Sequence, residues 1–142
     1  MNEFSENNLI EQTAVKIFAD LWGVKNFINA YSEEGDALLG RENQGQVVLT
    51  GRLKPALEKL NPDAPQEAIA QALTEITRDR STASMVNANQ EIYKLIKDGV
   101  KVEIRDEHGS FEAINIKVID FNDPTKNDFL LVSQMWITGE LH

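Results

Sequence analysis

The chain has 142 residues, which is enough for one domain that buries roughly two thirds of its unfolded surface. Its 42% apolar and 26% charged residues are typical of a globular protein, and its formal net charge of −9 disfavours binding to duplex DNA by the chain alone. The lack of cysteine excludes disulfides and thiolate metal sites, and no apolar run approaches the roughly 20 residues of a membrane span. Because the first residues also lack the basic start of a signal peptide, we expect a cytoplasmic location.

Helical patterns dominate the chain up to residue 97. A first helix is predicted over 5–22 and ends before Gly23. Residues 24–46 have the composition of a loop with at most one strand, and 47–49 fit either a short strand or the start of a helix. Three further helices are predicted, over about 53–60, 64–76 and 85–97.

The boundaries of these later helices carry clear signals. Asn61-Pro62 closes the helix before it, and Gly99 is placed as the C-terminal cap of the last one. Within the middle helix, Ile69, Leu73 and Ile76 recur at helical spacing and are predicted to face the core.

After Gly99 the apolar period changes from helical to alternating. We predict a strand from Val100 to Arg105, a turn over 106–110 and a return strand to Phe121. A last strand over 128–138 is apolar on both faces, which is typical of a strand inside a sheet with neighbours on both edges. Since only four residues come after it, the chain is expected to be a piece of a longer protein.

The pattern therefore predicts an α+β fold as a single domain over residues 1–142. Its helices occupy about 5–97 and its strands about 100–138, so that the helices come first and a meander of three strands comes second.

Glu11 stands out on the first predicted helix. At about 100° per residue, the apolar residues of this helix fall within one arc about 160° wide, and Glu11 lies inside that arc. The arc contains Ile10, Ala14, Val15, Ile17, Phe18, Leu21 and Trp22. A carboxylate on an inward face needs compensation, because an unpaired buried charge costs several kcal/mol.

Three explanations for Glu11 are open. The helix start, a nearby loop or water could satisfy its charge. It could form a buried ion pair with Arg41 or Arg52. It could also bind a metal or act in catalysis in a cleft between helix and sheet.

Other motifs do not indicate a site. Residues 35–40 have the glycine spacing of a phosphate loop, but Arg41-Glu42 stands where that loop needs Lys and Ser/Thr. His108 lies beside Gly109 in the predicted hairpin turn and is expected to be solvated. The acidic residues around that turn are more typical of a hydrated surface than of a metal site.

Three blocks in the right order are more specific than any single motif. The first is Leu53…Leu57…Leu60-Asn61-Pro62, followed by Ile69 and Ala72. The second is Asn89…Tyr93…Lys97-Asp98-Gly99-Val100-Lys101-Val102. The third is Ile119-Asp120-Phe121…Pro124…Asn127-Asp128-Phe129-Leu130…Val132…Gln134. Together they resemble the N-terminal region of the R subunit of type I restriction enzymes, over about residues 5–140.

This resemblance implies a restriction-endonuclease-like fold of the PD-(D/E)xK type, with a mixed sheet flanked by helices that is incomplete at the C-terminal end of this chain. It implies a parent enzyme that cuts DNA with Mg²⁺ and ATP and works with modification and specificity subunits on double-stranded DNA. In the family, an acid on the first helix joins an Asp and a Glu-x-Lys from adjacent strands in binding the metal.

Only Glu11 matches that pattern, as the first-helix acid, for both the catalytic and the metal-binding role. Glu6 is a weaker candidate because it lies outside the apolar arc, and Glu140 cannot begin Glu-x-Lys since His142 occupies the lysine position. The fragment alone is therefore expected to be inactive and to hold no cofactor. The alternative is a non-catalytic α+β docking module of a larger complex, in which Glu11 is structural.

Overall fold

The computed structural model describes residues 10–22, 27–29, 39–43, 45–133, 135 and 137. By its contacts the chain forms two compact units. One is the continuous segment Thr50–Asp128, and the other joins Met1–Leu49 with Phe129–His142. The continuous segment is thus inserted, in the sequence, between the two parts of the other unit.

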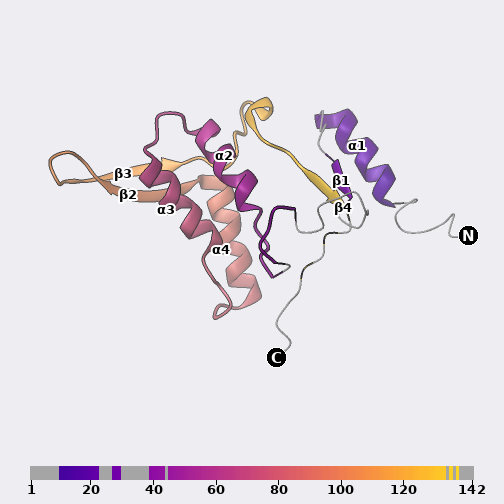
Figure 1. Cartoon of the computed structure of the whole chain (residues 1–142), viewed down its shortest axis with the longest axis horizontal. Coiled ribbons are helices and arrows are strands. Elements are labelled where there is room, and N and C mark those ends of the chain that lie inside the picture. The colour runs from indigo at the N-terminus through magenta and orange to yellow at the C-terminus, as the bar shows by residue number, and fades with distance from the viewer. Residues whose placement is uncertain are drawn as a thin grey trace, which may run out of the picture. The chain divides into compact units, whose positions relative to one another are not determined.

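The inserted unit begins with three helices (Figure 1). They are α2 (Thr50–Leu60), α3 (Gln66–Thr77) and α4 (Met85–Asp98). Residues 47–49 form no strand and lie directly before α2, which agrees with the predicted alternative of a helix entry. Pro65 precedes α3, where its fixed φ suits a helix start. Ser84 caps α4 by accepting a hydrogen bond from the Asn87 amide.

A hairpin comes after α4. Strands β2 (Val100–Arg105) and β3 (Phe111–Ile116) pair antiparallel, with Val100 opposite Ile116 and Arg105 opposite Phe111. The Asp106 carboxylate accepts hydrogen bonds from the amides of His108 and Ser110, which closes the turn. The predicted hairpin and its turn are therefore confirmed.

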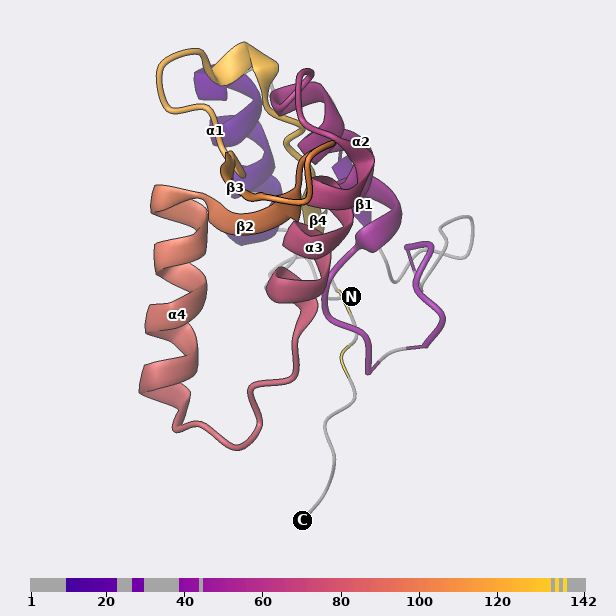
Figure 2. The ribbon, with the colours of Figure 1, turned by 90° about the vertical axis from the view of Figure 1, so that its left-hand side faces the viewer.

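The core of this unit lies between the hairpin and the helices α2 and α3. Alternate residues of β2 are buried, and they meet the apolar stripe of α3. The fully or nearly fully buried apolar residues are Leu57, Ala68, Ile69, Ala72, Val100, Val102, Ile104 and Ile116. The predicted inward stripe of α3 is only partly buried. Ile69 is fully buried, whereas Leu73 and Ile76 pack against the core and stay partly exposed. Figure 2 shows α4 standing at one flank of the unit and leading into β2.

The other unit contains helix α1 (Gln12–Trp22) and a pair of short strands. Strand β1 (Phe27–Asn29) pairs in parallel with β4 (Leu131–Ser133), with Ile28 opposite Val132. The predicted start of the first helix at Ser5 lies outside the described residues.

The structure confirms the α+β class but corrects the predicted meander of three strands. The last strand pairs with β1, which precedes helices α2 to α4, and not with the hairpin. The return strand of the hairpin ends at Ile116 and not at Phe121. It stops there because the amide of Lys117 donates to the side-chain oxygen of Asn61 at 2.8 Å, outside the hairpin ladder. A short 3₁₀ turn over Pro124–Lys126 comes next.

Two further predictions concern the burial of the last strand and the number of domains. Around β4, the side chains of Leu130, Leu131 and Val132 are half-buried, which is less than the full burial predicted from both faces. The single domain over 1–142 stays a prediction, because two compact units of one chain can belong to one domain.

Candidate functional site

Glu11 precedes α1 in a π-helical turn and is half-buried. Ala14, Val15 and Phe18 lie three, four and seven residues further along the helix and are also half-buried. Glu11 therefore shares the covered stripe of this helix, as its place in the apolar arc predicted. Short π-helical turns are rare and often occur at functional sites.

The apolar arc of α1 is only partly covered. Ile10, Ile17 and Leu21 form a second stripe along its other side, and all three are exposed. The prediction that the whole arc faces inward is wrong for these residues. The arc was wider than the roughly 100° that one neighbouring surface covers, so one side of the arc stays open.

The two arginines proposed as partners of Glu11 have other contacts. Nη2 of Arg52 lies 2.5 Å from Oδ1 of Asp128. Arg41 is buried, and its Nη1 donates to the carbonyl oxygen of Gln46 at 3.0 Å. The ion-pair explanation of Glu11 therefore stays a prediction, as do its catalytic and metal-binding roles.

A magnesium site needs more ligands than Glu11. Within the described residues, no three His, Cys, Asp or Glu side chains lie close enough together to hold a metal ion. One carboxylate leaves most of the octahedral positions of Mg²⁺ to other groups. The described part of the chain therefore does not fit a complete metal site. Glu6, Glu140 and most of the glycine-spaced segment 35–40 lie outside it.

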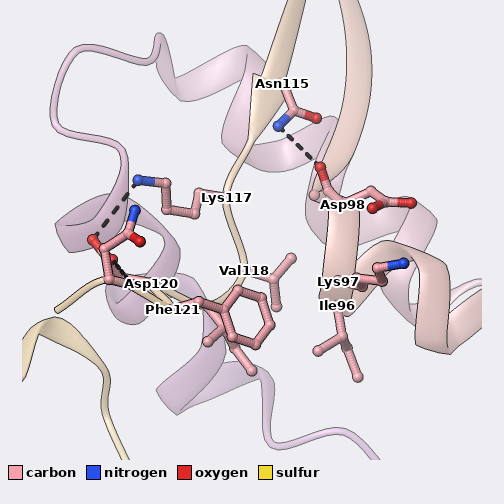
Figure 3. A pocket seen from close by; sticks show the side chains of 11 residues that line it. Ile96, Lys97, Asp98, Asn115, Lys117, Val118, Asp120 and Phe121 are labelled. Carbon is pink, nitrogen blue, oxygen red and sulfur yellow. Dashed lines mark hydrogen bonds and ion pairs between the residues drawn. The ribbon is translucent and has the colours of Figure 1, made fainter. Parts of the chain in front are cut away.

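A pocket of about 160 Å³ lies in the inserted unit, between the end of α4 and the segment after β3 (Figure 3). Ile96, Val118 and Phe121 form its apolar part, and Lys97 and Asp98 belong to its polar part. The lining includes no histidine, serine or threonine. The pocket thus combines an apolar part with charged side chains, which suits the binding of a partly apolar group.

Close approach of backbone segments forms one side of this pocket. Gly99 adopts φ +84°, and a Cβ there would lie 2.6 Å from Nδ2 of Asn115. That same Nδ2 donates to the carbonyl oxygen of Asp98 at 3.1 Å (Figure 3). The glycine predicted as a helix cap thus also allows β3 to approach the end of α4.

Asp120 holds the segment after β3 in place. Its Oδ1 accepts hydrogen bonds from the amides of Asn122 and Asp123, at 3.0 and 2.9 Å. Its own amide donates to the side-chain oxygen of Asn127, whose Nδ2 donates back to the Asp120 carbonyl. The Asp123 amide is the main cause that lowers the pKa of Asp120, with smaller contributions from the Asn122 amide and Lys117.

These contacts give Asp120 a structural role. Sequence reasoning predicted neither the pocket nor this loop. The available signal was Asp120 together with Asn122, Asp123 and Pro124, a spacing typical of Asx turns. His108 is exposed in its turn, as expected.

In the part of the chain that the structure describes, no helix combines the length and apolar character needed to cross a membrane. No solved structure matches the chain at a significant level.

Comparison with known proteins identifies relatives over nearly the whole chain. Residues 3–142 match the family model described as "Type I restriction enzyme R protein N terminus". The "Type I restriction enzyme HindI endonuclease subunit" of Haemophilus influenzae is 28% identical over 133 residues, which are 94% of this chain and 12% of that protein. The "Putative type I restriction enzyme MjaIXP endonuclease subunit" of Methanocaldococcus jannaschii is 28% identical over 95 residues, 66% of this chain and 9% of that protein.

The chain thus spans only 12% and 9% of the lengths of these two relatives. The family match extends over Glu11 and α1, the hairpin and the loop held by Asp120. The chain belongs to the family of type I restriction enzyme R protein N-terminal regions.

Proposed function

We propose that the chain is the front part of the endonuclease and translocase subunit of a type I restriction system. The whole subunit cleaves foreign double-stranded DNA by phosphodiester hydrolysis, requires Mg²⁺ and ATP, and assembles with modification and specificity subunits in the cytoplasm. The family match over residues 3–142 and the names of the two relatives support this proposal.

Glu11 is the residue that connects the proposal to the structure. It lies in line with the half-buried stripe of α1. Burying a carboxylate there costs free energy unless a hydrogen bond, an ion pair or a bound metal ion compensates its charge. As the first-helix acid of a PD-(D/E)xK site, it would bind Mg²⁺ together with acids that lie outside the described residues. Its position among half-buried apolar side chains is the observation that carries this assignment.

The decisive experiment replaces this carboxylate by an amide of the same shape. Glu11→Gln in the full-length subunit should lower DNA cleavage by at least about a hundredfold, the scale on which removal of one catalytic group acts. ATP hydrolysis should stay unchanged, because the proposed role concerns the nuclease site alone. Asp20→Asn is the matched control, since Asp20 is an exposed acid on the same helix. Unchanged cleavage by Glu11→Gln, or an equal loss of both activities, would contradict the assignment.

The isolated 1–142 polypeptide should not cut DNA. The described residues do not form a complete metal site, and Glu11 alone cannot hold and use a catalytic cation. Incubation with magnesium and supercoiled plasmid should leave the plasmid intact. Robust cleavage that is lost in Glu11→Gln would show that the site is complete within these residues and would contradict the proposed division.

The second candidate is a non-catalytic docking module. Two observations favour this candidate. The inserted unit is compact and has its own core, and several of its apolar side chains are exposed and could contact a partner. The reading frame beyond His142 distinguishes the two candidates. An Asp and a Glu-x-Lys on alternating apolar runs would support the nuclease, and a stop codon would support the module.

A further inference from the structure

Helix α4 has an apolar arc that is too wide for the surface it covers. At about 100° per residue, its apolar side chains span about 180°, whereas one packed face needs about 100°. The arc contains Leu95, Ala88, Ile92, Met85, Ile96, Tyr93 and Val86, in this order around the helix. An arc of this width is typical of a helix with neighbours on two sides.

The structure shows one of these two sides covered. Ala88, Ile92 and Leu95 are half-buried, and Leu95 packs against the core of the inserted unit. Within the inserted unit the opposite half of the arc is uncovered, since Met85, Val86 and Tyr93 are 82%, 65% and 64% exposed. None of the residues of α4 is buried. Asn89 is the one polar side chain within this open half.

The open half continues into the pocket. Ile96 lies at the C-terminal end of the helix, and its side chain lines the pocket together with Val118 and Phe121 (Figure 3). Phe121 is 66% exposed. We call the surface formed by Met85, Val86, Tyr93, Ile96 and Phe121 the α4 face. With the pocket at its end, it offers a hollow for one apolar side chain of a partner, which is how binding anchors commonly work.

We propose that the α4 face docks against another segment of the same polypeptide, outside residues 1–142. This inference rests on the proposed function. The matched region is 12% of the Haemophilus influenzae subunit, so a polypeptide of that length has ample chain to cover the face. The contacting segment presents an apolar ridge with one side chain in the pocket.

The size of the face favours this partner over a second copy of the chain. Five side chains that expose on the order of 100 Å² each provide roughly 500 Å² of apolar surface. A stable complex of separate proteins needs about 800 Å² from each partner. Contacts between domains of one chain are smaller, about 600–1,500 Å² in total, because the link supplies a high effective concentration.

Charge also argues for a protein partner. The formal charge of the chain is −9, and Lys97 and Lys117 at the pocket are balanced by Asp98 and Asp120. A phosphate backbone would gain little from such a surface. The apolar stripe, by contrast, gains from any surface that removes it from water.

Because the chain has no cysteine, a single introduced thiol can report on the face. Tyr93→Cys places it in the open half of the arc, and Lys94→Cys places it on the exposed opposite side. Both variants are treated with a maleimide in the 1–142 polypeptide and in the full-length subunit, and mass spectrometry of the α4 peptide gives the labelling rate.

We expect the thiol of Tyr93→Cys to react at least about tenfold more slowly in the full-length subunit than in the 1–142 polypeptide. A tenfold slower reaction corresponds to a docking free energy of about 1.4 kcal/mol. Lys94→Cys should react equally fast in both. Adding Val86→Asp to the full-length Tyr93→Cys variant should restore fast labelling, since a charge in the stripe opposes burial.

Three results would overturn the proposal. They are equal rates for Tyr93→Cys in both polypeptides, slow labelling of the 1–142 polypeptide that depends on its concentration, and protection that requires added modification and specificity subunits. Labelling does not depend on cleavage. A full-length Glu11→Gln/Tyr93→Cys double variant that still cuts DNA but protects the thiol would contradict the proposed role of Glu11 alone.

Discussion

Arg52 and Asp128 are 76 residues apart in the chain, and their side chains meet with Nη2 and Oδ1 at 2.5 Å. Arg52 lies in the first turn of α2, and Asp128 is the last residue of the inserted unit. The pair therefore joins the two ends of this unit. An insertion whose ends are held together can fold as a body of its own, because its entry and exit do not have to be fixed by the rest of the chain.

The strength of this ion pair can be measured by a double-mutant cycle. Arg52→Ala, Asp128→Ala and the double variant should give a coupling of about 0.2–1 kcal/mol, the range for partly exposed pairs. Each side chain is about one third exposed, at 34% and 33%, so high salt should reduce the coupling. Urea unfolding of the four proteins provides the measurement. A coupling near zero at low salt would show that the pair contributes nothing to the closure of the unit.

The inserted unit should fold alone. Residues 50–128 contain all the buried apolar residues in the described part of the chain, together with the hairpin and the helices that cover them. We expect the isolated segment to give dispersed amide NMR signals and a cooperative urea transition. Leu57→Ala in this segment should lower its free energy of unfolding by about 2–5 kcal/mol, because Leu57 is fully buried. A segment that stays unfolded under native conditions would contradict this prediction.

Three glycines allow a graded test of the backbone at the end of α4. Gly99→Ala should destabilise most, because φ +84° costs about 1–3 kcal/mol without glycine and the new Cβ would also lie 2.6 Å from Asn115. Gly109→Ala keeps the strain at φ +79° but meets no atom within 4 Å, so its effect should be smaller. Gly51→Ala lies in α2 with open space and should be neutral or stabilising by up to about 1 kcal/mol.

Urea midpoints of the three variants give the order. If Gly99→Ala and Gly109→Ala were equally destabilising, close approach of β3 to α4 would not matter, and Gly99 would serve only as a helix cap.

Most of the inserted unit could be predicted from local sequence signals. Helix ends depend on neighbouring residues, so Asn61-Pro62 and Gly99 gave boundaries close to those observed. The alternation from Val100 to Arg105 predicted the strand that it forms, and the turn around Gly109 fixed its antiparallel partner.

The pairing of β1 with β4 could not be predicted in this way. Alternation shows that a segment can be a strand, but it does not identify a partner about a hundred residues away, and the closest strand in sequence was chosen instead. The apolar arc of α1 was predicted to face inward for a similar reason. Composition shows that a side is apolar, but only the structure shows that Ile10, Ile17 and Leu21 on that arc are exposed.

Only the part of the candidate site that lies on one helix could be predicted. Glu11 was identified because a helical wheel depends only on the spacing of residues along one helix. The structure places Glu11 on the half-buried stripe, as expected. Its companions in a metal site would come from other strands, which local spacing cannot bring together. The pocket beside Ile96 and Phe121 depends on three segments meeting, so no single pattern indicated it.

Asp120 should make the stability of the inserted unit depend on acid pH. Hydrogen bonds from the amides of Asp123 and Asn122 favour its ionised form, so its pKa in the folded chain lies below the ordinary value of 3.8. A lowered pKa means that this contribution is fully present above pH 3.8 and is lost as the pH falls through the folded value.

Asp120→Asn tests this dependence, because the amide oxygen can still accept both backbone hydrogen bonds while the charge is removed. We expect the variant to be less stable than the unaltered chain near about pH 6.5, and the difference to shrink as the pH falls below 3.8 and through the lower pKa of the folded chain. Lys117→Ala should change the profile less, since Lys117 lies 3.7 Å from the carboxylate and is half exposed. Urea unfolding across this range provides the measurement. A difference between Asp120→Asn and the unaltered chain that does not change with pH would show that the charge of Asp120 is not what stabilises the loop.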